Sequence, residues 1–427
     1  GTAGTLAVLT ALDEGATVCC LQKESTPVAH GNGSAGIIRD ASTDAGILRW
    51  MQSIRKMNNY RVNWDLFKFF TTNSGETLCW LDKKSEEAGY PASAHSAATV
   101  VTYDNGDVCA LCTHNFGVKP ENNGNLVKAL CDMAEKQGAV FHYSTPGVQL
   151  VVDNGAVTGV IGKTSTGYIK VNANKAVIVA TGDYQNNQAM VERFCPDVKG
   201  LARKQQSKTG DGHIMSIMAG GHMVNVGHAH MVHDADSAGN GFSPFPLLCL
   251  NANGERFMNE EMSMPTWNEG CRANINQDDP GVFVRLFDSN YPEYYPKAPA
   301  AEDMQMYIPG AQENPTGVYK DLIDTHVCDT LDELAEELRV PADALKKSVA
   351  RWNELCEQGS DVDFGLAPEN LHPIDTPPYW GIRQWVRVTA INGGVAVDGN
   401  YQAIDADNNP IPGLFVVGTT GGDLCGG

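Results

Sequence analysis

Two short apolar runs lie far apart in the chain, and both end at a glycine. Residues 176–182 read AVIVATG, and residues 413–418 read GLFVVG. Continuous apolar runs of this length are typical of strands buried on both faces of a parallel sheet. Between them, from about residue 200 to 370, prolines, tyrosines and methionines become more frequent and polar loops lengthen. The sequence therefore predicts a parallel-sheet domain that is interrupted by a separate, inserted domain.

A chain of 427 residues is longer than one hydrophobic core usually supports, which agrees with two domains. We expect residues 1–205 and 371–427 to form one Rossmann-like α/β domain, and residues 206–370 to form an inserted α+β capping domain. Helical periodicity predicts helices over residues 4–14, 64–89, 125–137, 331–338 and 341–358. Strands are expected over residues 16–21 and 168–171, and a hairpin over 148–163 about an Asn-Gly turn. Residues 30–36 are expected to form a glycine-rich loop.

The chain carries a formal net charge of −20, which argues against nucleic acid or an anionic membrane surface as a partner. No apolar run approaches the length of a membrane span, and no signal peptide is recognisable. The 12 cysteines lack the spacing of a disulfide framework, and we interpret them as reduced thiols. Cys109 and Cys112 form a CxxC pair with no second pair nearby, so no metal site is expected. These features leave the localisation open between the bacterial cytoplasm and export.

The first residues, GTAG, precede an apolar-periodic helix and a short strand-like run that ends in Gln22 and Lys23. In the dinucleotide fingerprint G-x-G-x-x-G, glycines let backbone N–H groups approach a pyrophosphate at a helix N-terminus. Gly1 and Gly4 fit the second and third glycines, so we expect the strand and the first glycine to precede residue 1. The fingerprint places an acid about 20 positions on, at the ribose hydroxyls, whereas Gln22 offers an amide that both donates and accepts.

Further segments follow the opening turn in a fixed order: HGNGSAG, TPGVQLVVDNGAVTGV, VIVATGDYQNN, KTGDGHIMSIMAGG, NANGERFMNEE, INGGVAVD and PGLFVVGTTGG. Together with GTAG, their order and spacing resemble the flavoprotein subunit of the fumarate reductase/succinate dehydrogenase family. That FAD-binding group includes soluble fumarate and urocanate reductases and ketosteroid dehydrogenases. The resemblance runs over almost the whole chain and implies a discontinuous FAD-binding domain with an inserted capping domain.

The resemblance also implies which residues surround the FAD. The segment HGNGSAG is similar to a loop that wraps the pyrophosphate and flavin, and the backbone of Val148 would reach the adenine. ATG resembles the Ala-Thr-Gly-Gly strand end beside the FAD, and the last two segments match those that cover the isoalloxazine. The implied FAD-binding residues are Gly1, Gly4, Gln22, Lys23, Gly31, Asn32, Gly33, Ser34, Gly36, Val148, Ala180, Thr181, Gly182, Gly210, Asp211, Gly393, Gly418 and Thr419.

The chain departs from the pattern of the fumarate-reducing members at three catalytic positions. Eight residues beyond Arg256, where the family's proton-donating arginine stands, the chain has Met264. The closing segment VTAINGG has no histidine before its glycines, and Thr419 replaces the acidic residue after Val-Gly. A dicarboxylate needs fixed cations or donors at both ends. We therefore expect a member of the soluble enoate reductase branch that does not reduce fumarate.

Candidates for the proton donor or carbonyl polariser are His230, His233 and Arg387. The histidines belong to the run VGHAHMVH, near the family's substrate-contacting histidine, and His228 belongs to the same run. A solvated or capping histidine, or a His233–Asp234 pair that braces a loop, is the alternative interpretation. The spacing His-x-His-x-x-His also allows zinc, but the family resemblance implies no metal. For Arg387 the alternative is a salt bridge at the domain interface.

We expect hydride transfer from flavin N5 to an activated C=C bond of an organic enone or enoate, with electrons from another protein or domain. Met262 and Met264 replace polar positions of the family pattern, and the surrounding aromatics suggest an apolar pocket for an aryl or polycyclic acceptor. Two alternatives stay open. One is a flavin dehydrogenase that desaturates a steroid-like ketone, and the other is a catalytically idle flavin-binding electron carrier.

Overall fold

The structure, a computed structural model, describes residues 1–29, 33–58, 60–90, 92–95, 99–116, 123–203, 205–225, 228–233, 245–262, 270, 273–274, 278, 280–310 and 324–422. It divides into two compact units. Unit 1 comprises residues 1–194, 205–229 and 390–427, and unit 2 comprises residues 195–204 and 230–389. The expected insertion began at residue 206 and ended at residue 370, whereas the packing keeps residues 205–229 with unit 1 and residues 371–389 with unit 2.

Unit 1 contains the two apolar runs as parallel neighbours. Strand β10 (Val177–Val179) pairs in parallel with β19 (Pro410–Val416), and β18 (Gln402–Ile404) joins on the far side of β19. Strand β1 (Cys19–Leu21) pairs in parallel with β6 (Val140–His142). The remaining helices of unit 1 are α1 (Thr2–Asp13), α2 (Asp44–Met57), α3 (Trp64–Glu87), α4 (Asn123–Lys136), α5 (Gln188–Phe194) and α6 (Asp211–Met218), with 3-10 turns η1 (Arg39–Ala41) and η8 (Gly418–Thr420). The parallel-strand prediction is confirmed.

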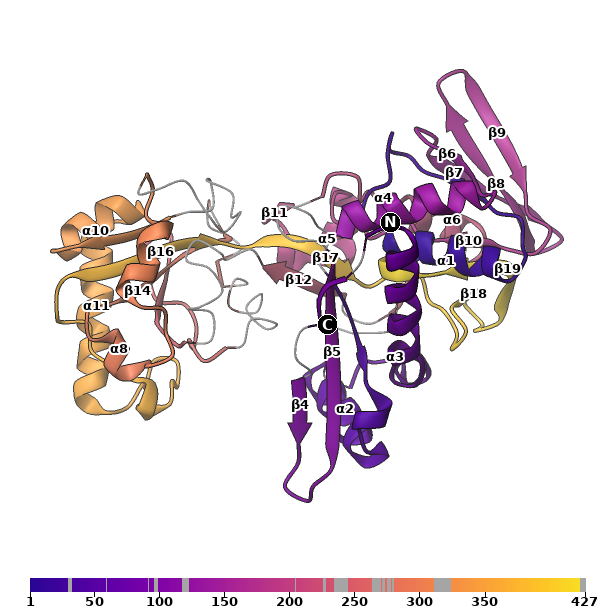
Figure 1. Ribbon diagram of the computed structural model, residues 1–427. Helices are drawn as coiled ribbons and strands as arrows, with labels where there is room; N and C mark the ends of the chain where they lie inside the picture. The colour runs from indigo at the N-terminus through magenta and orange to yellow at the C-terminus, as the bar shows by residue number, and fades with distance from the viewer. Residues whose placement is uncertain are drawn as a thin grey trace. The chain divides into compact units, whose positions relative to one another are not determined.

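Helices α1, α3 and α4 share one hydrophobic core, and Figure 1 shows α1 and α4 side by side near the chain's first residue. Val8 and Leu9 of α1, Leu81 of α3, and Leu126 and Leu130 of α4 are buried in this core. The apolar residues that recur at helical spacing in residues 4–14 and 125–137 therefore form the helix faces that pack in this core. This packing against α3 and α4 fixes the orientation of α1.

The expected loop at residues 30–36 is wrong in its second half. Residues Gly33–Ile37 form strand β2, which pairs antiparallel with β5 (Val108–Phe116), and β3 (Ala92–His95) and β4 (Thr99–Thr102) pair with β5 as well. The glycines serve close packing here: a methyl group on Gly36 would lie 2.7 Å from Leu78 Cδ1 and 2.9 Å from the carbonyl oxygen of Ser74 in α3. Strand pairing and this approach to α3 outweigh the weak strand preference of glycine.

The predicted hairpin is confirmed as β7 (Gly147–Asp153) and β8 (Ala156–Thr164), to which β9 (Gly167–Asn172) adds a third antiparallel strand. Asn154 and Gly155 take positive φ angles of 48° and 81°, as a type I′ turn requires. Helix α6 packs on β7.

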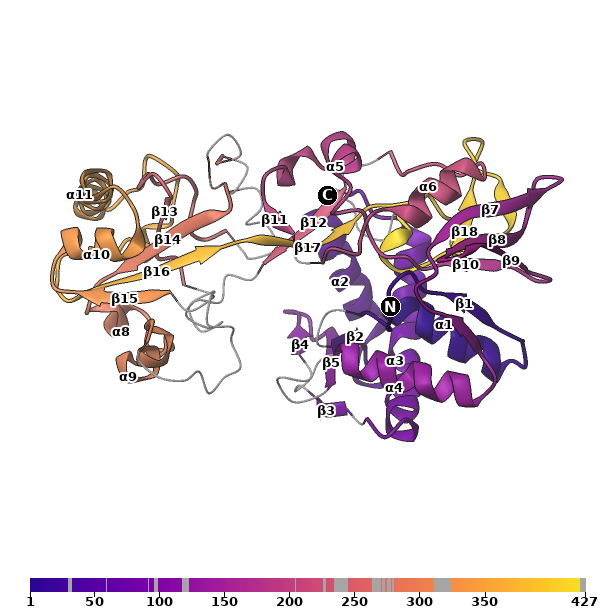
Figure 2. The same cartoon turned by 90° about the horizontal axis from the view of Figure 1, so that it is seen from above.

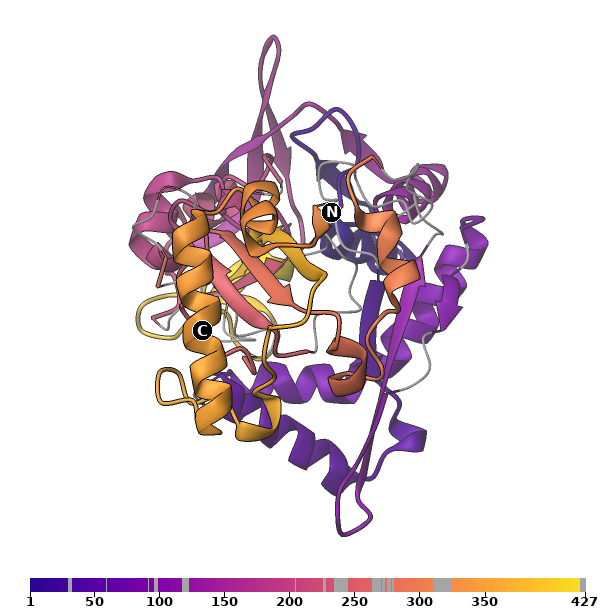
Figure 3. The same ribbon diagram turned by 90° about the vertical axis from the view of Figure 1, so that its left-hand side faces the viewer.

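Unit 2 is built on a four-stranded antiparallel sheet with the order β13 (Leu248–Asn251), β14 (Val282–Phe287), β16 (Tyr379–Trp385), β15 (Thr325–Cys328). Leu248, Leu250, Val284 and Leu286 pack against helices α10 (Leu331–Leu338) and α11 (Ala342–Gln358) on one face. The other face packs against the short helices α8 (Tyr291–Tyr294) and α9 (Ala301–Met304). Figures 2 and 3 show these layers, with α11 in orange. Both helices predicted in this stretch are confirmed.

Short segments complete unit 2: η2 (Pro196–Val198), β11 (Ala202–Arg203), η5 (Gln305–Tyr307) and η7 (Pro368–Asn370). Strand β11 pairs in parallel with the start of β17 (Arg387–Asn392), a strand that begins in unit 2 and ends in unit 1. Strand β12 (Ala229–His233) belongs to the same sheet. Within the described residues, no helix combines the length and the hydropathy needed to cross a membrane.

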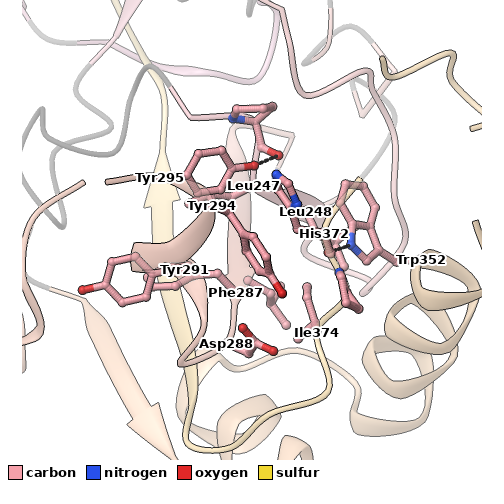
Figure 4. A pocket seen from close by; sticks show the side chains of 13 residues that line it. Leu247, Leu248, Phe287, Asp288, Tyr291, Tyr294, Tyr295, Trp352, His372 and Ile374 are labelled. Carbon is pink, nitrogen blue, oxygen red and sulfur yellow. Dashed lines mark hydrogen bonds between the residues drawn. The ribbon is translucent and has the colours of Figure 1, made fainter. Parts of the chain in front are cut away.

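A small cavity between the sheet of unit 2 and α8 is aromatic but does not suit an organic substrate. Its volume is about 20 Å³, room for roughly one water molecule. Figure 4 shows the rings of Tyr294 and His372, which stack with centroids 4.1 Å apart, and the indole N–H of Trp352, which donates to the carbonyl oxygen of His372. Asp288 is buried and accepts from the backbone N–H groups of residues 290, 375 and 376. This cavity is a gap in the core of unit 2.

Candidate functional site

The carboxyl ends of β10 and β19 meet the N-terminus of α1. A methyl group added to Gly4 would lie 3.3 Å from Cβ of Ala180, directly after β10. One added to Gly418, two residues after the end of β19, would lie 3.0 Å from Cβ of Ala3. Glycine therefore lets the first turn of α1 approach both strand ends. This edge of a parallel sheet is where open α/β folds bind nucleotides.

The N-terminus of α1 is suited to an anion. Gly1 is its N-cap, no side-chain hydrogen bond caps this end in the described part of the chain, and the first turn has no acidic residue. The first N–H groups of a helix lack intrahelical partners, and the helix dipole makes this end positive. Such N–H groups are the donors that a pyrophosphate-binding turn uses.

Lys23 links the end of β1 to the turn before α6. Its Nζ donates to Oγ1 of Thr209 at 2.6 Å and to Oδ2 of Asp211 at 2.9 Å, and Oγ1 of Thr209 donates to Oδ1 of Asp211 at 2.9 Å. Gln22 uses its Oε1 to accept from the backbone N–H of Glu24 at 3.1 Å. Two neighbouring stretches of predicted FAD residues, Gln22–Lys23 and Gly210–Asp211, thus lie next to each other.

The turn at Thr209–Gly212 is fixed by two glycines with different roles. Gly210 is the N-cap of α6 and takes a φ of 75°, which glycine adopts without strain. Gly212 allows a close contact, because a methyl group there would lie 2.2 Å from Oγ1 of Thr181. The N–H of Gly212 donates to that hydroxyl at 3.1 Å. Thr181 therefore joins the end of β10 to the start of α6.

The two closing segments are also joined to the end of β10. The N–H of Val395 donates to the carbonyl oxygen of Thr420 at 2.9 Å, and the N–H of Gly422 donates to that of Val395 at 2.8 Å. Oγ1 of Thr420 donates to the carbonyl oxygen of Gly182 at 3.0 Å. Gly182, Gly393 and Gly418 therefore belong to one arrangement, while Thr419 lies in η8 beside the buried Thr420.

A buried polar cluster follows Gly182 directly. The side chain of Asp183 is fully buried and accepts from Nζ of Lys208 at 2.8 Å, from the N–H of Gln185 at 2.9 Å and from the N–H of Ile391 at 3.2 Å. Burial lowers the pKa of Lys208, although the Asp183 carboxylate opposes that shift. Sequence analysis missed this pair. The detectable signal was Asp183 itself, which stands where the Ala-Thr-Gly-Gly pattern has its second glycine.

Beside this pair, the hydroxyl of Tyr184 is hydrogen-bonded to Nδ1 of His228. The His228 ring stacks on Phe194 at 5.2 Å and lies so close to Gly393 that a methyl group there would be 2.4 Å from the ring. His213 is fully buried against Tyr184, and among the described residues neither of its ring nitrogens has a hydrogen-bond partner. Burial lowers the pKa of His213 to about 4 and also lowers the pKa of His228. Both imidazoles are therefore neutral at pH 7.

Other predicted FAD residues lie elsewhere in unit 1. Gly33, Ser34 and Gly36 belong to β2, and Ser34 lines a cleft of about 200 Å³ together with residues of α1 and α3. Val148 lies in β7 and is 40% exposed. Gly31 and Asn32 fall in a gap between the described ranges. The structure thus brings Gly1, Gly4, Ala180, Thr181, Gly182 and Gly418 together, and Lys23 with Gly210 and Asp211.

The predicted catalytic residues belong to unit 2. His230 and His233 lie in β12, and their side chains are not among those that the structure describes. Arg387 is the first residue of β17, half-buried, and pairs in register with Ala202 of β11. Within the described ranges, no three His, Cys, Asp or Glu side chains are grouped to hold a metal ion.

The chain is matched from residue 1 to 427 by the family model described as FAD binding domain. It is 27% identical to the vinyl phenol reductase of Lactiplantibacillus plantarum, over 100% of this chain and 89% of that protein. It is also 27% identical to the urocanate reductase of Eggerthella lenta, over 66% of this chain but only 46% of that protein. In fold it resembles the open conformation of a flavocytochrome c3 fumarate reductase, with a TM-score of 0.73, 22% identity, and 100% and 72% of the two chains covered.

The chain therefore belongs to the FAD binding domain family of flavoproteins, in the enoate reductase branch of the fumarate reductase/succinate dehydrogenase group, and its cofactor is FAD. It is an FAD-dependent oxidoreductase that acts on CH–CH bonds. The residues present fit FAD: the glycine N-cap of α1, the close approach of Gly4 to Ala180, and the turn that Lys23 and Asp211 hold together. The relatives do not favour the ketosteroid-type dehydrogenase alternative.

Proposed function

We propose that this protein reduces an activated C=C bond of an organic acceptor other than fumarate, using electrons that another protein or domain delivers to its FAD. The observation that carries the proposal is the match to vinyl phenol reductase, which spans this whole chain and 89% of that relative. The family's proton-donating arginine and closing histidine are replaced here, which supports an acceptor without two carboxylates.

Bound FAD supplies hydride from its reduced ring, and the side chains of this protein bind, orient and protonate. The first turn of α1 would hold the pyrophosphate, and the segments around Gly393 and Gly418 would position the ring. Hydride addition leaves negative charge on the acceptor, which a fixed cation or proton donor must stabilise. Arg387 is our first candidate for that role, because it is half-buried and its planar guanidinium can donate two hydrogen bonds to a carbonyl or carboxylate. His230 and His233 remain the alternatives.

The acceptor we propose is a planar alkene conjugated to an aryl ring or to a single carbonyl or carboxyl group. Three relatives, a vinyl phenol reductase, a urocanate reductase and an NADH:acrylate oxidoreductase, are named for compounds with this conjugation. Met262, in place of a polar family residue, favours an apolar part in the substrate. For the electron donor we propose a basic protein, because the net charge of −20 would steer one to the surface.

The test is flavin reoxidation under anaerobic conditions. The FAD-loaded protein is reduced with one equivalent of dithionite and mixed with a vinyl phenol, urocanate, acrylate, an aryl enone or fumarate, and flavin absorbance is followed. We expect rapid reoxidation by at least one conjugated acceptor and none by fumarate. Arg387→Gln should slow the reoxidation by about 100-fold or more while FAD content stays unchanged. Reoxidation by fumarate alone, or by no member of the panel, would contradict the proposal.

A further inference from the structure

The Asp183–Lys208 ion pair is the most deeply buried ion pair among the described residues of unit 1. Its two charged atoms are 2.8 Å apart, and the side chains are 0% and 6% exposed. Asp183 follows Gly182 at the end of β10, and the side-chain carbons of Lys208 lie 3.6–3.9 Å from where a Gly182 side chain would begin. The pair therefore borders the turn that binds FAD.

The same pair is attached to the segment on the other side of that turn. The N–H of Ile391 donates to Oδ2 of Asp183, the oxygen that also accepts from Lys208. Ile391 is two residues before Gly393, and Gly394 packs against the backbone of Thr420. Gly182 is thus the residue before Asp183, and Gly393 is two residues after the N–H group that donates to its carboxylate.

Burial of an ion pair is a poor way to stabilise a fold. Removing two charges from water costs more than their attraction usually returns, and apolar replacements are often neutral or stabilising. Here the carboxylate also stands where the family pattern has glycine, which offers no side chain at all. Buried charges are screened weakly, so they act on neighbouring groups over roughly 10 Å.

We propose that Asp183 and Lys208 form a charge-compensated pair beside the FAD, and that the balance of the two charges sets the FAD reduction potential. Uptake of two electrons and one proton makes the flavin more negative by one charge, so a nearby cation favours the reduced form and a nearby anion disfavours it. With both partners present the two effects largely cancel. Asp183 keeps the lysine from raising the potential, and Lys208 keeps the carboxylate from lowering it.

The experiment measures the midpoint potential of the purified, FAD-loaded protein at pH 7 by titration against a reference dye, with no alkene present. Asp183→Asn, which removes the carboxylate beside Lys208, should shift the potential upward. Lys208→Met, which leaves the carboxylate uncompensated, should shift it downward. The double variant should return close to the wild-type value. Opposite signs are the diagnostic feature, because a merely structural role would shift both single variants in the same direction.

Lys84→Met serves as the matched control. Lys84 is also a mostly buried lysine of unit 1 and pairs with Asp13 at 2.8 Å, but Asp13 lies at the opposite end of α1 from the cofactor turn. The midpoint potential of Lys84→Met should equal that of the wild type. If Lys208→Met does not retain FAD, the midpoint potentials of Asp183→Asn and the double variant still test the inference. The double variant should then have the lower potential of the two, close to that of the wild type. Shifts of equal sign, or unchanged potentials with FAD bound, would overturn the inference and leave the proposed alkene reduction untouched.

Discussion

Replacement of Gly212 by alanine tests whether the contact between α6 and the end of β10 builds the FAD site. The added methyl group would lie 2.2 Å from Oγ1 of Thr181 and 2.5 Å from Cγ1 of Val179. Ordinary contact distances begin near 3.4 Å, so α6 or the strand end must move by about 1 Å. Overpacking of this kind costs about 1–3 kcal/mol, because a packed core yields little room.

The displacement also breaks the hydrogen bond from the N–H of Gly212 to Thr181, which contributes about 0.5–1.5 kcal/mol. We therefore expect Gly212→Ala to destabilise unit 1 by about 2–4 kcal/mol. Because Thr181 and Asp211 move apart, the affinity for FAD should fall at least tenfold, equivalent to about 1.4 kcal/mol.

The assay has two readouts: thermal release of FAD followed by flavin fluorescence, and FAD affinity measured by titration of the apoprotein. Gly147→Ala is the control, since the nearest atom to its added methyl group is the flexible end of Met215, at 3.4 Å. That variant should change neither readout appreciably. Wild-type stability and FAD affinity in Gly212→Ala would refute the close contact and, with it, the assignment of this turn to the cofactor.

Three further substitutions have expected outcomes. Asp361→Asn should destabilise unit 2 by about 3 kcal/mol in urea unfolding, because it removes one of two buried carboxylates that pair with Arg256. Burial opposes ionisation of Asp361, but hydrogen bonds from Arg256 and backbone N–H groups hold its pKa below the usual value, so its contribution is present above about pH 4 and lost on further acidification. His213→Phe should be neutral or stabilising at pH 7 and should remove the wild-type loss of stability between about pH 6.5 and 4, since the folded pKa is about 4. Tyr184→Phe should cost about 0.5–1.5 kcal/mol by calorimetry, because it leaves Nδ1 of the buried His228 without this hydroxyl.

Much of unit 1 could be predicted because its signals are local. Helix α1, the β7–β8 hairpin and strands β10 and β19 follow from periodicity, an Asn-Gly turn and continuous apolar runs. Strand β2 could not be predicted in this way, because GNGSAG has low strand propensity. Its strand conformation depends on pairing with β5 and on the approach of Gly36 to α3, two contacts that are distant in sequence.

The domain boundaries differ for a related reason. Composition changes near residue 200, yet residues 205–229 pack with unit 1 because Lys208 pairs with Asp183 and α6 packs on β7. Neither contact changes the local composition. The family resemblance implied that Gly210 and Asp211 bind FAD, but the predicted boundary placed them in the capping domain. In this chain, motif order was the better guide to which residues share a unit.

The family's histidine before the closing glycines is absent here, but a histidine from another part of the chain lies beside the same glycine. The segment VTAIN directly before Gly393 has no histidine, yet the ring of His228, from a different part of the chain, lies against that glycine. Its exposed fraction is only 5%, it is bonded to Tyr184, and burial keeps it neutral. A buried, neutral imidazole can shape and support the closing segment, but it cannot clamp a carboxylate as an exposed, protonated one would. The replacement therefore restores packing at the flavin segment without restoring a dicarboxylate site, which agrees with an acceptor that is not fumarate.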